Sequence, residues 1–493
     1  MPSPPLTSPT RRIAIIGGGI SGLAAAYRLH ELAAESGSPL DIQLFESAGH
    51  LGGVLQTYER DGFLIERSAD MFTTREPWAL SLCQRIGFTD QLIPTNAVQR
   101  KAFVVRNGKL MAVPEGFTLM SPAKVWPVLA TPILSPLGKL RLGCEYFVPK
   151  KSDGQDESLE SFSVRRFGRE AYERLIQPLI GGIYTADPKQ LSMSATMPQF
   201  VEMEKKFGSL VRGMRSKTNA PSEQKATGGE SGARYGMFVA PRMGMSSFVS
   251  AIAARLPSQT IRLNTRIQSL NRLPDSRWEL KLVASYSTSH AANESSEQFD
   301  AVILASPGPK SRDLLQAIDL PLADLIGRIP YAGAAVVVEA YDRSNIQHPL
   351  NGFGFVVPAI EGRKILASSM SSVKFSGRAP EGKLLTRTFI GGATQSELLR
   401  HSDDELAAIA HDELAQLLGI KGSPIFSDVQ RWDGKMPQYH LGHLDLVEKI
   451  EARANSINNF ALAGNAYRGV GIPFCVHSGE VAAERVFQSV MGQ

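Results

Sequence analysis

The feature that most constrains this chain is the glycine motif Gly17-x-Gly19-x-x-Gly22, which separates two very different segments. The run before it, Arg11 to Ile16, is short and apolar and is typical of a buried parallel strand. The segment after it, residues 21–36, is rich in Ala and Leu and has its apolar side chains at helical spacing. A strand, a tight glycine turn and a helix in this order predict the opening of a dinucleotide-binding α/β domain.

Each glycine of the motif has its own physical role. Gly17 permits the tight turn, Gly19 lets the backbone approach a pyrophosphate, and Gly22 lets the helix pack near the strand. The N–H groups at the start of the helix then hold the phosphates, and Gly18 and Ser21 belong to the same predicted set. The alternative is a strand-to-helix turn that binds no ligand.

A second strand, residues 41–45, ends at Glu46, which lies 24 residues after Gly22. An acid at this separation accepts hydrogen bonds from ribose hydroxyls and repels a 2′-phosphate, which argues against NADP. A further glycine pair, Gly52 and Gly53, follows directly. It has no role in a simple nicotinamide-binding fold and indicates that the backbone passes close to an extended cofactor.

The other end of the chain repeats the pattern. A strand over residues 460–464 ends in glycine, and a Gly-rich turn containing Val470, Gly471 and Ile472 leads into a helix. The start of that helix would face the pyrimidine end of a flavin and stabilise negative charge on it. Two glycine turns directed at one cofactor favour FAD.

Composition excludes several other classes. The net charge of +5 comes from 53 basic and 48 acidic residues without a basic, aromatic-rich tract, so nucleic-acid binding is not expected. Three scattered cysteines indicate a reducing compartment and no disulfide scaffold. His440-x-x-His443 has no third ligand nearby, so no metal is expected. Residues 1–10 are expected to be a disordered tail. The protein is expected in the cytoplasm, either free or in peripheral contact with a membrane.

Seven segments, which together span nearly the whole chain, carry a resemblance to a known family: 17–29, 62–72, 164–193, 200–214, 371–385, 436–444 and 462–473. In these segments the chain resembles the flavin-dependent protoporphyrinogen and coproporphyrinogen oxidases of haem biosynthesis. This is an oxygen-dependent porphyrinogen oxidase family within the flavin amine oxidase superfamily.

The resemblance implies a mixed α/β and α+β fold in three parts. A Rossmann-like FAD-binding domain, of the amine oxidase and p-hydroxybenzoate hydroxylase type, is assembled from 11–90, 236–310 and 440–493. A mixed-sheet substrate-binding domain comes from 91–111 and 311–439. A helical cap, 112–235, completes the fold, and in family members this part often associates with membranes.

The resemblance also implies site residues. Those that pass the flavin are Arg67, Ser68, Ala69 and Asp70. Ile267 would contact the adenine end, and Val470 to Ile472 would face the isoalloxazine ring. No catalytic side chain is assigned, because flavin N5 does the chemistry.

The implied substrate is a tetrapyrrole, with Phe389 and Val356 against its rings and Gly182 where backbone approaches the macrocycle. Several family members have an Arg for a substrate propionate at the position aligned with Ala102. Strand alternation would put Arg100 on the same face, so Arg100 is the candidate replacement. This loss of the family's Arg favours coproporphyrinogen III slightly over protoporphyrinogen IX, with activity on both.

The expected reaction is the six-electron oxidation of a porphyrinogen to a porphyrin with molecular oxygen as acceptor. An amine oxidase and a non-enzymatic FAD-fold escort protein are the alternatives. The resemblance leaves open a homodimer and transfer of the product to a ferrochelatase.

Overall fold

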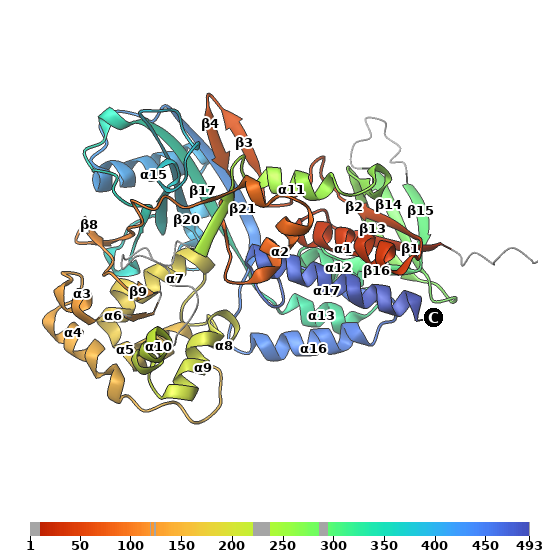
Figure 1. Ribbon diagram of the computed structural model, residues 1–493, viewed down its shortest axis with the longest axis horizontal. Helices are drawn as coiled ribbons and strands as arrows, with labels where there is room; N and C mark the ends of the chain where they lie inside the picture. The colour runs from red at the N-terminus through yellow and green to blue at the C-terminus, as the bar shows by residue number, and fades with distance from the viewer. Residues whose placement is uncertain (1–9, 119, 123–124, 220–236, 285–293, 493) are drawn as a thin grey trace, which may run out of the picture.

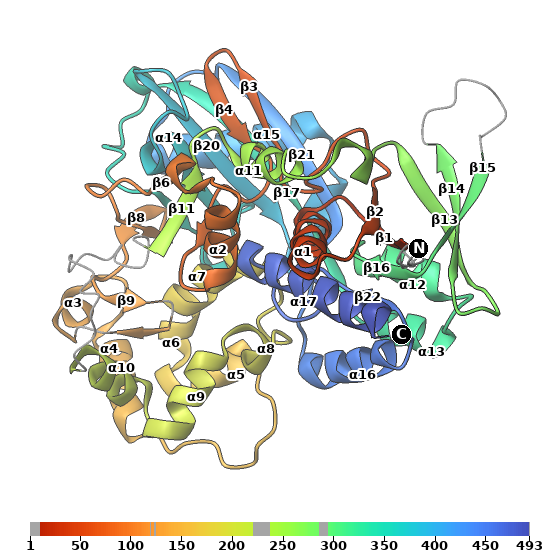
Figure 2. The same ribbon diagram turned by 45° about the vertical axis from the view of Figure 1, so that its right-hand side comes forward.

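The computed structural model describes residues 10–118, 120–122, 125–219, 237–284 and 294–492. Of the expected disordered tail, residues 1–9 lie outside the described residues. Figures 1 and 2 show a sheet flanked by long helices, a second and larger sheet beside it, and a unit built from short helices next to both.

Within the described residues, the first sheet has five strands in the order β12-β2-β1-β16-β22, and all its pairs are parallel. Its strands are β1 (Arg11–Ile16), β2 (Leu40–Phe45), β12 (Ile261–Arg262), β16 (Ala301–Leu304) and β22 (Phe460–Leu462). Every residue of β16 is buried. A parallel sheet covered on both faces needs such continuous apolar strands, which is why the sequence shows them as short apolar runs.

Helices cover one face of this sheet, and strands and helices cover the other. Ile13 and Ile15 point to the side of α1 (Ile20–Ser36), α2 (Pro77–Arg85), α11 (Met245–Ala253) and α17 (Ile472–Met491). Ala14 and Ile16 point to the other side. That side carries the antiparallel strands β13 (Thr265–Arg272), β14 (Trp278–Ala284) and β15 (Glu294–Phe299), and the helices α12 (Gly308–Leu315), α13 (Leu320–Gly327) and α16 (His443–Asn455).

The second sheet has seven strands in the order β21-β17-β20-β19-β18-β7-β8 within the described part of the chain. They are β7 (Phe103–Arg106), β8 (Lys109–Ala112), β17 (Tyr331–Asp342), β18 (Gly354–Val356), β19 (Ala367–Met370), β20 (Lys383–Gly391) and β21 (Phe426–Pro437). The sheet is mixed, because β18 and β7 are parallel and the other neighbours are antiparallel. Helix α15 (Asp403–Leu418) packs on one face. The hairpin of β3 (Thr57–Arg60) and β4 (Phe63–Glu66) packs on the other.

The helical unit lies at the lower left of Figure 1. Its elements are α3 (Val125–Ala130), α4 (Pro136–Gly143), the 3-10 turn η2 (Cys144–Phe147), α5 (Leu159–Phe167), α6 (Arg169–Ala171), the π-helical turn η3 (Tyr172–Ile176), α7 (Gln177–Tyr184), α8 (Met193–Thr196), α9 (Pro198–Phe207) and α10 (Leu210–Asn219). Pro178 lies at the start of α7, directly after the π-helical turn η3.

Shorter elements complete the fold. They are β5 (Phe72–Thr73), β6 (Leu92–Pro94), β9 (Phe117–Thr118), β10 (Ser121–Pro122), β11 (Phe238–Pro241), α14 (Ser371–Lys374), and 3-10 turns at Thr89–Gln91, Ser258–Thr260, Arg343–Asn345, Ala359–Glu361 and Ser396–Arg400. Across the described ranges, we find no helix with the length and apolarity needed to cross a membrane.

Candidate cofactor and substrate site

The two glycine turns predicted from the sequence lie at the same edge of the first sheet. Strands β1, β16 and β22 are consecutive and parallel, so their carboxyl ends meet at one edge. Gly17 directly follows β1, and Gly464 lies two residues after β22. In open parallel sheets, ligands bind at this edge. The fold therefore brings together two turns that are more than 400 residues apart in the chain.

The first turn has the glycine requirements that the motif predicts. Gly17 has a φ of 116°, and a Cβ there would lie 2.6 Å from the carbonyl oxygen of Ala305. A Cβ on Gly22 would lie only 1.9 Å from the carbonyl oxygen of Gly17. A Cβ on Gly19, in contrast, would meet nothing within 4 Å. Gly17 and Gly22 are thus required by close packing, whereas Gly19 borders space that a phosphate could fill.

The second glycine pair packs directly on the first turn. The Gly52 N–H donates a hydrogen bond of 2.8 Å to the carbonyl oxygen of Gly18. A Cβ on Gly53 would lie 3.6 Å from the Cα of Gly19. Gly52 and Gly53 have φ values of 96° and 61°, which favour glycine. The backbone of Gly52 and Gly53 therefore packs directly against the backbone of Gly18 and Gly19.

Glu46 stands where the sequence predicts, at the end of β2 beside the glycine turn. Its Oε2 accepts a hydrogen bond of 2.8 Å from the Gly18 N–H, and its Oε1 accepts one of 2.8 Å from the Ala48 N–H. The Thr265 N–H at the start of β13 donates to the Glu46 carbonyl oxygen at 2.8 Å. Ile267, two residues further along β13, is 8% exposed and belongs to the core, so its contact with adenine stays a prediction.

The N-termini of α1 and α17 fit an FAD dinucleotide. Both N-cap residues, Gly19 and Gly471, lack a side-chain cap. The N–H groups of these first turns are therefore left to a ligand, and the helix dipoles favour its negative charge. Ser21 lies in the first turn of α1 and is 6% exposed. Its carbonyl oxygen would lie 2.1 Å from a Cβ on Gly479, so the two helices approach each other closely.

The segment predicted to pass the flavin is fixed by buried charges that the sequence does not reveal. The Asp70 carboxylate pairs with Lys374 Nζ at 2.9 Å and with Arg387 Nη1 at 3.2 Å. Burial alone would raise the pKa of Asp70, but Lys374 and Arg387 outweigh it and lower that pKa to about 2. Arg387 also donates to the carbonyl oxygen of Ser68. Ala69, between these two, is exposed.

Arg67, at the start of this segment, contacts the second sheet. Its guanidinium lies over the Tyr58 ring, 4.6 Å from the ring centroid, and 4.0 Å from the Asp428 carboxylate. Trp432 Nε1 donates a hydrogen bond of 2.8 Å to the Arg67 carbonyl oxygen. Sequence reasoning missed Lys374 and Arg387, although one signal was present: Arg387 is a charge in the middle of strand β20.

The residues predicted to hold the substrate form one wall. Val356 pairs in register with Ala367, and Ala367 pairs with Phe389, so the three side chains stand in a row across β18, β19 and β20. Gly182 of α7 faces this row. A Cβ on Gly182 would lie 3.7 Å from Ala367 Cβ and 3.8 Å from Val356 Cγ1. The structure thus brings Phe389, Val356 and Gly182 together.

Arg100 does not lie on a strand, so the alternation argument for it is wrong. Strand β7 begins at Phe103, and residues 97–102 precede it without strand pairing. Ala102 is instead 8% exposed and packs into the core of the helical unit. Arg100 remains a candidate on other grounds, because its Nε is buried and has no hydrogen-bond partner among the described residues.

Comparisons with known proteins agree with this geometry. The family model described as flavin containing amine oxidoreductase matches residues 20–487. The coproporphyrinogen III oxidase of Staphylococcus aureus is 32% identical over 97% of this chain and 99% of its own length. Protoporphyrinogen oxidase 2, chloroplastic/mitochondrial, of Arabidopsis thaliana is 30% identical over 97% of this chain and 94% of its own.

A solved structure of a proposed protoporphyrinogen oxidase from Exiguobacterium sp. 255-15 has the same fold. Its TM-score is 0.83 and its sequence identity 29%, with 99% of this chain and 100% of that chain covered. The family match, residues 20–487, includes the C-terminal glycine turn, the buried charge cluster of Asp70, Lys374 and Arg387, and the row of Val356, Ala367 and Phe389. The chain therefore belongs to the flavin-containing amine oxidoreductase family, which confirms the predicted fold class and the prediction of an FAD-dependent oxidoreductase.

Proposed function

We propose that this protein oxidises a porphyrinogen to the corresponding porphyrin in haem biosynthesis. The observation that carries the proposal is the row of Val356, Ala367 and Phe389 across β18, β19 and β20, with Gly182 of α7 packed against its Val356 end. An apolar row with an aromatic ring at its other end suits one face of a large, flat ring system. The full-length similarity to relatives named as coproporphyrinogen III oxidase and protoporphyrinogen oxidase supports it.

The chain's own residues contribute to the reaction by positioning the substrate and shielding it from solvent. Bound FAD would supply two-electron oxidation, and three such oxidations with O₂ as the final acceptor would remove the six hydrogens. The row on β18–β20 orients the macrocycle, and Arg387 joins β20 to the segment Ser68–Asp70. The substrate wall is thereby held at a fixed position relative to the proposed flavin segment.

We also propose that the three structural units serve as separate domains, with FAD bound by 11–90, 236–310 and 440–493, substrate by 91–111 and 311–439, and 112–235 as the helical cap.

Coproporphyrinogen III has four propionates and protoporphyrinogen IX two, so the former gains more from a free cation. Arg100, whose Nε has no partner among the described residues, is the proposed propionate ligand. Coproporphyrinogen III is therefore the proposed preferred substrate.

The test is anaerobic reduction of the purified yellow protein with each porphyrinogen. Porphyrinogen should bleach the visible flavin band, and coproporphyrinogen III should do so with the higher kcat/KM once oxygen is admitted. A tenfold preference for protoporphyrinogen IX would reverse the substrate assignment. A yellow protein that neither porphyrinogen bleaches would point to the escort protein, and bleaching by an amine alone would point to an amine oxidase.

The helical unit has a surface suited to peripheral contact with a membrane. Leu137 and Leu140 of α4 and Phe147 of η2 are 78%, 67% and 80% exposed. Cys144, also exposed, lies between them at helical spacing. These four residues form one exposed apolar stripe along α4 and η2. Such a stripe is costly in water and is typical of helices that lie in a membrane interface.

A basic pocket of about 520 Å³ adjoins the stripe at Phe147. Its lining includes the cations Lys150, Lys205, Lys206 and Arg212 and no acidic residue. None of the four forms an ion pair within the described parts of the chain. Cations beside exposed apolar side chains match the phosphates of an acidic lipid surface. We therefore propose an acidic phospholipid bilayer as the partner of this face.

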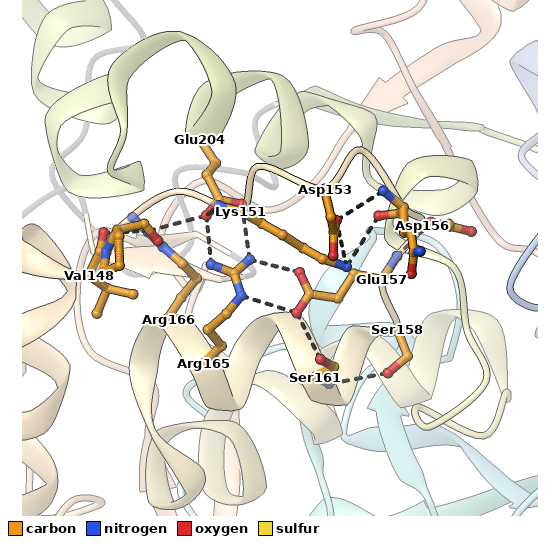
Figure 3. A network of polar contacts seen from close by, with 12 residues as sticks. Val148, Lys151, Asp153, Asp156, Glu157, Ser158, Ser161, Arg165, Arg166 and Glu204 are labelled. Atoms are coloured by element: carbon orange, nitrogen blue, oxygen red, sulfur yellow. Dashed lines mark hydrogen bonds and ion pairs between the residues drawn. The ribbon is translucent and has the colours of Figure 1, made fainter.

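Buried hydrogen bonds join two segments that line the basic pocket. Arg166 is fully buried and donates to the carbonyl oxygens of Val148, at 2.9 Å, and Gly208, at 3.0 Å, both of which line the pocket. It also pairs with Glu204 at 3.3 Å. Figure 3 shows Arg166 beside Val148 and Glu204. The neighbouring Arg165 reaches Glu204 at 2.7 Å. These contacts link the segment before α5 to the end of α9 on the inner side of the pocket.

Vesicle flotation tests this partner. The protein should float with phosphatidylglycerol vesicles and not with phosphatidylcholine vesicles, and salt should release it. Both Phe147→Glu and the pair Lys205→Ala and Lys206→Ala should reduce flotation several-fold. Leu320→Glu, which charges an exposed apolar residue of α13, is the matched control and should float normally. Equal flotation of all variants, or none for the wild type, would remove the proposal.

A further inference from the structure

Tyr439 is a buried residue that the proposed chemistry does not use, and its hydroxyl spans the C-terminal glycine turn. The side chain is 2% exposed. Its hydroxyl donates a hydrogen bond of 2.7 Å to the carbonyl oxygen of Asn465 and accepts one of 2.8 Å from the Gly469 N–H. One oxygen atom therefore ties together the two ends of the turn that precedes α17. From the sequence alone, Tyr439 is interpreted as packing between domains, with a contact to FAD as the alternative.

The Tyr439 ring packs against the ring of His443. The two rings are stacked, with centroids 3.9 Å apart and planes 14° from parallel. His443 Nε2 lies 2.8 Å from the carbonyl oxygen of Tyr467, which can only accept, so Nε2 carries the proton. Burial lowers the pKa of His443, which keeps the ring neutral. Three carbonyl or amide groups of the turn, at residues 465, 467 and 469, are thus bound by two stacked side chains.

Residues 439–442, which precede α16, are also hydrogen-bonded to the helical unit. The Tyr439 carbonyl oxygen accepts from the Ser192 N–H at 2.8 Å, and the Leu441 N–H donates to Gln190 at 2.8 Å. The Gly442 N–H donates to Asp156 Oδ2 at 3.2 Å. Asp156 belongs to the polar network drawn in Figure 3. Residues 439–443 therefore connect the turn before α17 to the unit that contains Gly182.

We infer that Tyr439 is a positioning residue for the flavin: it holds residues 465–469 so that the N-terminus of α17 stands at a fixed distance from the ring. This inference rests on the proposed function, because it takes the turn to face the flavin. Without the hydroxyl, the Asn465 carbonyl and the Gly469 N–H lose a buried partner, and the turn can move. Negative charge on the flavin ring would then be stabilised less well by the helix dipole.

The test compares Tyr439→Phe with wild type and with Tyr184→Phe. Tyr439→Phe keeps the ring and its stacking on His443 but removes both hydrogen bonds. Tyr184→Phe is the matched control, since its hydroxyl donates to the Thr196 carbonyl oxygen at 3.1 Å inside the helical unit. Two readouts are used: sulfite titration of the visible flavin band and the midpoint potential under anaerobic dye equilibration. Both report stabilisation of negative charge on the flavin ring.

We expect Tyr439→Phe to bind sulfite about five- to tenfold more weakly, with a more negative potential and a lower kcat at nearly unchanged KM. Tyr184→Phe should match the wild type. If Tyr439→Phe does not fold, His443→Phe serves instead, because it keeps an aromatic ring and loses only the bond to Tyr467. Wild-type values for the variants would overturn the inference. A wild type without flavin would overturn the proposed function instead, so the two failures are distinguishable.

Discussion

Lys374 Nζ lies 2.9 Å from Asp70 Oδ2, and both side chains are almost fully buried. Asp70→Asn would leave Lys374 and Arg387 as buried cations without their carboxylate, which should cost about 3–5 kcal/mol of unfolding free energy. Lys374→Met should cost clearly less, because Arg387 still pairs with Asp70. Urea unfolding of the two variants measures the difference. Equal losses would mean that Arg387 does not share the carboxylate.

Gly19→Val should abolish FAD binding and leave the fold intact. Gly19 has φ −71° and ψ 176°, which valine adopts readily, and its Cβ would enter open space. The branched side chain would then occupy the space proposed for the pyrophosphate. Flavin absorbance per protein and circular dichroism check both parts. Gly143→Val is the control, since Gly143 also has open space around it. A folded Gly19→Val with full flavin content would refute the assignment.

Phe389→Ala should raise KM or lower kcat by about tenfold or more while FAD stays bound, because an aromatic wall of the substrate slot is lost. The control is Phe355→Ala on β18, two strands away in the same sheet, whose ring is 2% exposed and packs toward α15. That variant should lose thermal stability and keep its kinetic constants. Steady-state kinetics and melting curves separate the two. Lowered melting temperature with wild-type kinetics for Phe389→Ala would place this residue in the core.

Arg100→Ala should weaken substrate binding by about 1.5–3 kcal/mol if its guanidinium holds a propionate through a charge-assisted bond. The effect should be larger for coproporphyrinogen III, which has more carboxylates. Lys109→Ala on neighbouring β8 removes an exposed cation and should leave KM unchanged. KM for both substrates gives the comparison. No change for Arg100→Ala on either substrate would place the carboxylate ligand elsewhere.

Glu339 should make the protein less stable as pH rises from 5 to 8. Burial, with a smaller contribution from Asp412, raises the pKa of Glu339 from 4.5 to about 8. Between these values the folded protein keeps the proton while the unfolded chain loses it, so unfolding free energy falls with rising pH. Glu339→Gln removes this dependence and should be about 2–4 kcal/mol more stable at pH 8. At pH 5 the two proteins should melt alike.

Local patterns were enough to predict the elements that carry the cofactor site. The strand over 41–45 and the helix after Gly19 both appear in the structure within a residue or so. The spacing of apolar residues and the positions of glycines depend only on residues that are close in the sequence, so they can be read without knowledge of the fold. The pairing of the two glycine turns also followed, because parallel strands share one ligand-binding edge.

The buried partners could not be predicted in the same way. Asp70, Lys374 and Arg387 come from a loop, a short helix and a strand, and only the tertiary fold brings them together. The alternation argument for Arg100 failed because it assumed strand geometry three residues before β7 begins at Phe103. Tyr439 looked like packing, since nothing local indicates that a hydroxyl will meet both Asn465 and Gly469. Polar contacts between residues far apart in the chain leave no repeating pattern in the sequence.

The strand order of the first sheet also governs when the protein can bind its cofactor during synthesis. Strand β22 pairs with β16 and is followed by α17, so the last elements of the fold complete the site that β1 begins. A growing chain can pair β1 with β2 early, but the edge stays open until residues 460–491 have left the ribosome. Until then an apolar strand edge is exposed, the situation in which nascent chains aggregate or need chaperones. Flavin capture is therefore expected only after residues 460–491 have emerged.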